Sequence, residues 1–239
     1  MRAVNTTLLN GETLRFPIVT RDVTQFIAAY PVRVSDVNRL LPNDLRAFDS
    51  GYGLTHMALY WLQAGDSDFG GFSEVSVNFT VREPYYRSRA FHYHANPVST
   101  ERARCTGYEV WGNPTTLAQV EITTSGTTVG CTLTQDSQFV LSLCATPAAG
   151  TPWLTNGLLS AASDFAQRKQ SSVYRYAQAA RLCSREDKPA HVQLELGQHP
   201  LSQQLRDLLL DDQPLYSIYM TGSTILSGPR FSELFKLLH

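Results

Sequence analysis

Lysine is the side chain that most readily forms an imine with a carbonyl substrate, and this chain has very few lysines. Its 239 residues include 17 arginines but only three lysines, Lys169, Lys188 and Lys236. All three lie in polar or terminal stretches, whereas a reactive lysine needs dry surroundings that lower its pKa toward neutrality. The sequence therefore predicts that catalysis through a lysine imine is absent.

A glutamate on a predicted strand is the second group that could do chemistry. Residues 72–82, FSEVSVNFTVR, alternate with a period of two, so Glu74 faces away from Val75, Val77 and Val81. A buried glutamate has a raised pKa and can serve as a general acid or base near neutral pH. A glutamate on a solvated strand face does neither, and that interpretation is the commoner one. From the residues alone, both remain open.

Three histidines on neighbouring predicted strands could also act together. His92 and His94 share one face by the period-two rule, and His56 comes from an adjacent strand. Such a set could in principle hold zinc. Neighbouring strand histidines are more often simple polar pairs, so we expect no metal and no other cofactor.

Strands must position most of these residues, because the chain is rich in β-type patterns. Strands are expected over Tyr52–Leu62, Phe72–Arg82 and Arg89–Val98, followed by a meander over Thr116–Thr123, Thr127–Thr134 and Gln138–Cys144. A further hairpin is expected from Val173–Leu182 and His191–Leu196. Short helices are expected at Ser35–Leu41, Leu158–Gln167, Leu201–Leu210 and Ser232–Leu238. The predicted fold class is mainly β (α+β), with one domain over residues 1–239.

Composition and charge exclude several classes of partner. The formal net charge is −1, from 20 basic and 21 acidic side chains, so no overall field favours nucleic acid or anionic lipid. The first residues lack the apolar core of a signal peptide, which leads us to expect a cytoplasmic location. The motifs GxxxxGK[ST], GxGxxG, GxSxG and HExxH are all absent from the sequence. The expected partner is therefore a small-molecule substrate.

The segment TGYEVWGNPTTLAQVEI, residues 106–122, is the most informative motif. It resembles the signature of the acetoacetate decarboxylase family, in which Gly-Arg-Glu and a short strand precede Pro-Lys-Lys-Leu. The residues that fit are Gly107, Glu109, Trp111, Gly112, Pro114 and Leu117. Tyr108 stands where the family has arginine, and Thr115 and Thr116 stand where it has its two lysines.

The resemblance extends over most of the chain. Residues 28–45 are similar to the family's early strand and helix, residues 71–81 to the segment carrying its active-site glutamate, and residues 199–229 to its C-terminal run. It implies an acetoacetate decarboxylase-like antiparallel β-barrel or double sheet with a few short helices. It also implies a homo-oligomer, and it makes Glu74 the counterpart of the family's glutamate.

The departure at the lysine pair changes the expected chemistry. A threonine hydroxyl is a neutral donor and acceptor and cannot form an imine. The resemblance then implies that Glu74, Thr115 and Thr116 are catalytic and converge on one pocket. Arg21, Tyr108, Glu109 and His56 are the expected substrate-binding residues. Arg15 competes with Arg21 for its role, and Glu109 could instead hold the Gly112–Pro114 turn.

Two functions are compatible with this pattern. The first is a non-decarboxylating enzyme that acts on a carbonyl or keto acid by acid/base chemistry, through enolisation, dehydration, aldol-type addition or cyclisation, in specialised metabolism. The second is a non-catalytic small-molecule-binding or regulatory protein on the same fold. Fold similarity does not decide between them.

Overall fold

The computed structural model describes residues 4–68, 70–82, 89–147, 153–165, 170–189 and 191–226, with only the strand course given for 153–165, 170–184 and 224–226. Strands dominate, as the sequence predicts. They are β1 (Val4–Thr7), β2 (Thr13–Phe16), β3 (Ile18–Arg33), β4 (Leu54–Ser67), β5 (Phe72–Arg82), β6 (Arg89–Val98), β7 (Thr115–Leu117), β8 (Gln119–Ser125), β9 (Thr128–Gln135), β10 (Gln138–Ala145), β11 (Trp153–Phe165), β12 (Gln170–Asp187), β13 (Val192–Leu196) and β14 (Tyr216–Leu226).

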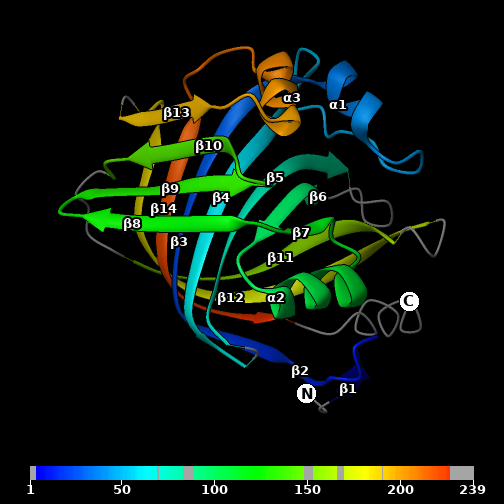
Figure 1. Cartoon of the computed structure of the whole chain (residues 1–239). Coiled ribbons are helices and arrows are strands. Elements are labelled where there is room, and N and C mark those ends of the chain that lie inside the picture. Colours follow the sequence, from blue (N-terminus) through cyan, green and yellow to red (C-terminus); the bar gives the residue numbers. More distant parts are fainter. Residues whose placement is uncertain are drawn as a thin grey trace.

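The helical elements are short and flank the sheets (Figure 1). They are α1 (Val34–Leu40), α2 (Glu101–Thr106), the single π-helical turn η1 (Gly107–Trp111) and α3 (Pro200–Leu208). The predicted helices at 35–41 and 201–210 are confirmed by α1 and α3. The one predicted at 232–238 lies outside the described residues. Within the described part of the chain, no helix has the length and apolar character needed to cross a membrane.

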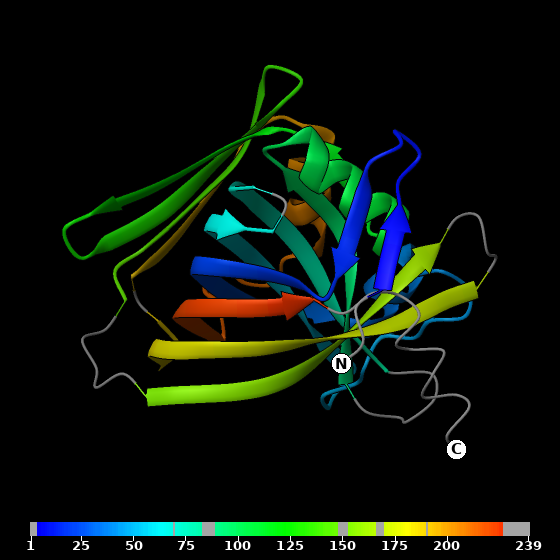
Figure 2. The ribbon, with the colours of Figure 1, turned by 90° about the horizontal axis from the view of Figure 1, so that it is seen from below.

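Eight strands form one strongly curved sheet in the order β11-β12-β14-β3-β4-β5-β6-β7 (Figure 2). Its long inner strands are antiparallel, and β3 and β4 pair over most of their length. Near one end, β11 also pairs with β6 in parallel, through Ala161–Phe91 and Ala162–His92. This contact is only two residues long. The two ends of the large sheet therefore approach each other but do not close into a continuous barrel. The architecture is a curved sheet with a second sheet on it, rather than a closed barrel.

A second, four-stranded sheet in the order β13-β10-β9-β8 covers one face of the large sheet. The predicted meander is confirmed by the antiparallel pairs β8–β9 and β9–β10. Valines and leucines of this sheet join Phe26, Trp61 and Val77 of the large sheet in one core, which α1 and α3 complete. Phe26 stacks on Trp61 at 6.0 Å between ring centroids. Burial of each such large side chain contributes about 2–3 kcal/mol, so this face holds the two sheets together.

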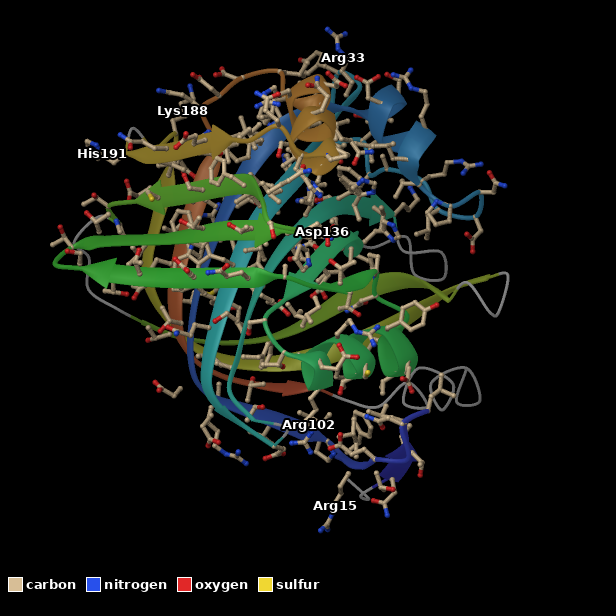
Figure 3. The ribbon with its side chains drawn as sticks, in the orientation of Figure 1. Arg15, Arg33, Arg102, Asp136, Lys188 and His191 are labelled. Carbon is tan, nitrogen blue, oxygen red and sulfur yellow. The ribbon has the colours of Figure 1, made fainter. Side chains whose placement is uncertain are left out.

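A smaller apolar cluster closes the opposite face of the large sheet at one end. It joins the β1–β2 hairpin to α2 and η1, and it includes Phe16, Val98 and Trp111. Phe16 meets Trp111 edge to face at 6.1 Å. The carboxylate of Glu12 in the hairpin also pairs with Arg102 of α2. Figure 3 shows Arg102 and Arg15 at this end of the molecule, with Arg33 and Lys188 at the other.

Two expectations about the second half of the chain are wrong. Part of residues 158–167 was expected to be helical because Leu and Ala favour helices, but residues 158–165 belong to β11, which pairs with β12 along all thirteen of its residues. Residues 166 and 167 lie outside the described residues. Residues 173–182 and 191–196 were expected to form a hairpin. They lie in different sheets instead, since β12 pairs with β11 and β14 whereas β13 pairs with β10.

Candidate functional site

Polar side chains gather on the face of the large sheet that lies opposite its apolar core. Directly opposed residues on adjacent strands point the same way. Gln25 of β3 lies opposite Leu62 of β4, which lies opposite Glu74 of β5. Ile27, Tyr60 and Ser76 are opposed in the same way two residues along the strands. Asn78 follows Ser76 on the same side of β5, so all these side chains share one face. We call Gln25, Tyr60, Glu74, Ser76 and Asn78 the polar face. The phenol of Tyr60 donates a hydrogen bond to Gln25 Oε1 (2.9 Å), and Asn78 Nδ2 donates to Ser76 Oγ (2.8 Å).

Glu74 is the ionisable member of the polar face. It lies between Leu62 of β4 and Val98 of β6, both of which are buried apolar residues. Burial among such neighbours disfavours the charged form and raises the pKa of Glu74 to about 7, although the amide of Asn96 opposes the shift. This is the direction expected for a glutamate among apolar neighbours. Glu74 therefore populates both protonation states near neutral pH.

Asn96 connects Glu74 to the segment that carries the family-like motif. Its side chain is buried and interacts with the Glu74 carboxyl, yet its Nδ2 makes no well-formed hydrogen bond. In β6 it pairs with Thr115 of β7, so both residues point to the same side of the sheet. A buried amide with an unused N–H is costly unless a ligand or water completes it. Asn96 thus offers a donor beside the carboxylate.

Thr115, where the family-like motif would have its first lysine, is buried, but its hydroxyl is already engaged. Its Oγ1 donates to the main-chain oxygen of Arg104 (2.8 Å), with a longer contact to that of Asn113 (3.4 Å). Its methyl group packs against Gly107, where an added Cβ would come within 2.5 Å of Thr115 Cγ2. The threonine therefore joins β7 to α2 and η1. Thr116, the next residue, is exposed.

The π-helical turn holds the other two motif residues on the surface side of this region. Tyr108 is exposed, and Glu109 accepts a hydrogen bond from the main-chain N–H of Leu9 (2.6 Å). Glu109 thus holds the β1–β2 turn rather than the Gly112–Pro114 turn. Gly112 ends η1 at φ 68°, a left-handed conformation that favours glycine.

Arg21 is not part of the polar face. Its guanidinium bonds Asp68 (2.7 Å) and lies 3.5 Å from Asp66, with about half of its side chain exposed. The structure brings Asn96 of β6 between Glu74 and β7, but it places Arg21 in a surface ion-pair network. A surface pair of this kind contributes little to stability.

The histidines do not form a metal site. His94 Nε2 lies 2.7 Å from Gln204 Oε1 of α3, while the ring of His56 meets that of Tyr216 edge to face at 6.0 Å. Among the described residues, no group of three histidine, cysteine or acidic side chains could hold a metal ion. His56 lies on β4, opposite Pro31 of β3, and is half-buried.

Of the three lysines, the structure describes Lys188 alone. Lys188 is exposed at the end of β12, where its backbone adopts φ 50°. Lys169 and Lys236 lie outside the described residues. Across the whole sequence these three are the only lysines, and none occupies the positions of Thr115 or Thr116.

The model of the acetoacetate decarboxylase (ADC) family matches residues 8–231. The chain belongs to the acetoacetate decarboxylase family. No curated protein sequence is similar enough to this family member to count as a match.

Solved structures of acetoacetate decarboxylase-like proteins share the fold. The Legionella pneumophila acetoacetate decarboxylase superposes with a TM-score of 0.65 at 17% identity, covering 89% of this chain and 86% of that one. An acetoacetate decarboxylase-like enzyme from Sphingomonas wittichii gives 0.59 at 13% identity, covering 89% and 92%. The enduracididine biosynthesis enzyme MppR, complexed with pyruvate, gives 0.61 at 15% identity, covering 95% and 97%. At such identities the likeness shows the fold alone.

Sequence reasoning missed most of the polar face in this acetoacetate decarboxylase family member. Gln25, Tyr60 and Asn96 lie on three different strands, and only the register brings them near Glu74. A signal was present for Asn96 and Asn78, since asparagine is uncommon inside strands that are otherwise apolar. A strand asparagine without an evident turn is worth testing as a buried polar group.

The raised pKa of Glu74 makes stability depend on pH. The folded protein keeps the proton up to about pH 7, whereas the unfolded chain loses it near 4.5. The contribution of protonated Glu74 is therefore complete below about pH 4.5 and is lost as the pH rises to 7. The expected loss is about 3 kcal/mol of unfolding free energy.

Urea unfolding at several pH values, with wild type and Glu74→Gln, measures this effect. Wild type should lose stability relative to the variant between pH 4.5 and 7, and the difference should level off above pH 7. Asp68 and Asp211, whose pKa values are lowered, affect stability at lower pH, and both are present in wild type and in the variant. A difference independent of pH would show that Glu74 ionises normally.

Proposed function

We propose that this protein is a non-decarboxylating enzyme that moves a proton on a carbonyl or keto acid substrate through Glu74, without an imine. The observation that carries the proposal is the partly buried Glu74, with a pKa of about 7, beside the buried amide of Asn96, which in turn pairs with Thr115 of β7. A carboxyl group with this pKa is suited to general acid–base catalysis at neutral pH.

The proposed step needs only Glu74 of the polar face and the neighbouring amide of Asn96. Ionised Glu74 takes a proton from the carbon next to the substrate carbonyl, and the electron pair of that C–H bond moves to form the enolate. Asn96 Nδ2 donates a hydrogen bond to the oxygen on which negative charge develops. Protonated Glu74 then returns the proton for isomerisation, or the enolate carbon attacks an electrophile in an aldol-type addition or cyclisation.

The engaged hydroxyl of Thr115 refines this assignment. Because Oγ1 already donates to the Arg104 carbonyl oxygen, the hydroxyl cannot also donate to an enolate. We assign Thr115 a positioning role, in which it fixes β7 beside Asn96. Thr116 and Tyr108 are exposed near the same segment and remain candidate contacts for a distal part of the substrate.

One structural neighbour supports the choice of substrate class. MppR has been solved with pyruvate and with the condensation product of pyruvate and imidazole 4-carboxaldehyde. A protein of this fold therefore binds a keto acid and the product of its condensation with an aldehyde. This supports carbonyl chemistry for the present chain, and a role in biosynthesis.

The absence of imine chemistry is directly measurable. Purified protein incubated with acetoacetate should release carbon dioxide no faster than buffer, because no lysine stands at Thr115 or Thr116. Borohydride added with a keto acid should leave the mass of the folded protein unchanged. Covalent labelling of Lys169, Lys188 or Lys236 would contradict the proposal.

Proton transfer itself is measured by deuterium incorporation. In D₂O, wild type should exchange the hydrogens next to the carbonyl of a bound oxo acid faster than buffer does, as followed by NMR. Binding of such acids with no exchange above buffer for any of them would favour the non-catalytic binding protein instead.

A further inference from the structure

A second cluster of side chains lies on the side of the polar face, at the other end of the sheet. Its centre is Tyr216 of β14, whose ring meets His56 edge to face at 6.0 Å. The guanidinium carbon of Arg185, on β12, lies 5.7 Å from the centroid of the same ring. The three side chains come from β12, β14 and β4. Arg185 of β12 pairs with Ile218 of β14, and Tyr216 of β14 pairs with Ala29 of β3, the strand next to β4.

A second arginine, Arg89 of β6, acts on this cluster through its charge. The Arg89 guanidinium carbon lies 4.6 Å over the ring of Phe48, and its positive charge lowers the pKa of both His56 and Tyr216. For each of these two groups burial has the larger effect, which lowers the pKa of His56 and raises that of Tyr216. At neutral pH the cluster therefore presents a neutral imidazole, a phenol and two cations.

Positive charge at this cluster is only partly balanced. Asp187 Oδ1 lies 3.9 Å from Arg185, with both side chains largely exposed, so this pair is weak. In the part of the chain that the structure describes, no carboxylate forms an ion pair with Arg89. Lys188, which follows Asp187 at the end of β12, adds a further exposed cation.

The register gives the spacing between this cluster and Glu74. Tyr216 lies in the row Tyr216–Ala29–Ala58–Asn78, which crosses β14, β3, β4 and β5. Asn78 is four residues along β5 from Glu74 and points to the same side. At about 3.3 Å per residue the two rows are roughly 13 Å apart along the strand, and Tyr216 lies three strands from Glu74, roughly 14 Å across the sheet at about 4.8 Å per strand.

We propose that Arg89, Arg185, Tyr216 and His56 bind the carboxylate of the substrate, and that this carboxylate is separated by several carbon–carbon bonds from the carbonyl that reacts at Glu74. The inference deepens the proposed function and rests on it. It names the substrate class as longer-chain oxo acids rather than β-keto acids, whose carboxylate is too near the ketone to span the two rows.

The chemistry of the cluster suits a carboxylate. A guanidinium donates two parallel hydrogen bonds to the two oxygens of such a group, and a phenol can add a third. Aromatic rings beside the arginines limit their motion, which reduces the entropy lost on binding. Asp187 is the one described carboxylate paired with the cluster, and a substrate carboxylate would displace this weak contact.

Isothermal titration with a series of oxo acids tests the inference. Acetoacetate, 5-oxohexanoate, 7-oxooctanoate, the methyl ester of 7-oxooctanoate and inorganic phosphate are compared on wild type. We expect 7-oxooctanoate to bind at least about tenfold more tightly than acetoacetate and than its own ester, since a charge-assisted bidentate contact is worth more than a neutral one. Equal affinity along the series, no binding of any acid, or tighter binding of phosphate would overturn the proposal.

Variants assign the effect to the arginines. Arg89→Gln and Arg185→Gln should each weaken 7-oxooctanoate binding about tenfold and leave the affinity for its ester unchanged. Arg39→Gln, an exposed arginine of α1 paired with Asp36, is the matched control and should have no effect. Circular dichroism checks that each variant is folded, and the comparison of acid and ester on wild type serves as a second measurement.

The Glu74→Gln variant separates the two proposals. If the carboxylate site is correct, this variant still binds 7-oxooctanoate with the wild-type preference over the ester. Loss of deuterium exchange with binding retained then supports both ideas. Exchange that depends on Glu74 but shows no preference for chain length would overturn the carboxylate site alone.

Discussion

Glu74→Gln should lower the rate of deuterium exchange on a bound oxo acid by about 100-fold to 10,000-fold, because it removes the group proposed to carry the proton. Glutamine keeps the size and the hydrogen-bonding shape of the side chain, so the polar face and substrate affinity should be largely preserved. NMR exchange rates and titration calorimetry on the same samples measure both quantities.

The pH dependence of the wild-type rate provides an independent check. Glu74 has a pKa of about 7, so its ionised form, the base, predominates above that pH. Exchange should therefore rise through pH 7 and level off above it, provided that substrate ionisation does not change in this range. Glu121→Gln on β8, an exposed glutamate far along the chain from the polar face, should leave the profile unchanged. An active Glu74→Gln enzyme would rule out the proposed role of this carboxylate.

Gly197→Ala should be among the most destabilising single substitutions in the chain. Gly197 follows β13 and precedes α3, and its N–H donates to the main-chain oxygen of Val140 (2.8 Å). A Cβ added there would lie 1.9 Å from the main-chain oxygen of Phe139 and 2.7 Å from its carbonyl carbon. These atoms belong to the paired strand β10, so relief requires the backbone to move.

The cost should be about 3 kcal/mol or more, which lowers Tm by roughly 6–12 °C for a chain of this size. Thermal unfolding followed by circular dichroism measures it. Gly126→Asn, in the open turn between β8 and β9, is the control, because nothing lies within 4 Å of its Cβ position and asparagine tolerates φ near +60°. Equal melting temperatures for Gly197→Ala and wild type would show that β10 and β13 can separate at this point without loss.

The local pattern of the chain determined much of its secondary structure. Phe72–Arg82 and Arg89–Val98 are strands with the predicted bounds, since alternation of apolar and polar residues has only one good solution over such lengths. Glu74 faces away from the valine row for the same reason. The motif at 106–122 determined the family, although its middle is π-helical rather than a strand.

Tertiary structure alone decided the rest. Residues 158–165 pair as a strand because β12 supplies a partner for each of them, and this contact overrides the helical preference of Leu and Ala. The register of the strands brings Asn96 to Glu74 and Arg185 to Tyr216, and no local pattern in the chain specifies it. The direction of a hydroxyl is equally invisible in sequence. Thr115 was expected to meet substrate, but its hydroxyl donates its hydrogen bond to the main-chain oxygen of Arg104, because α2 packs directly against β7.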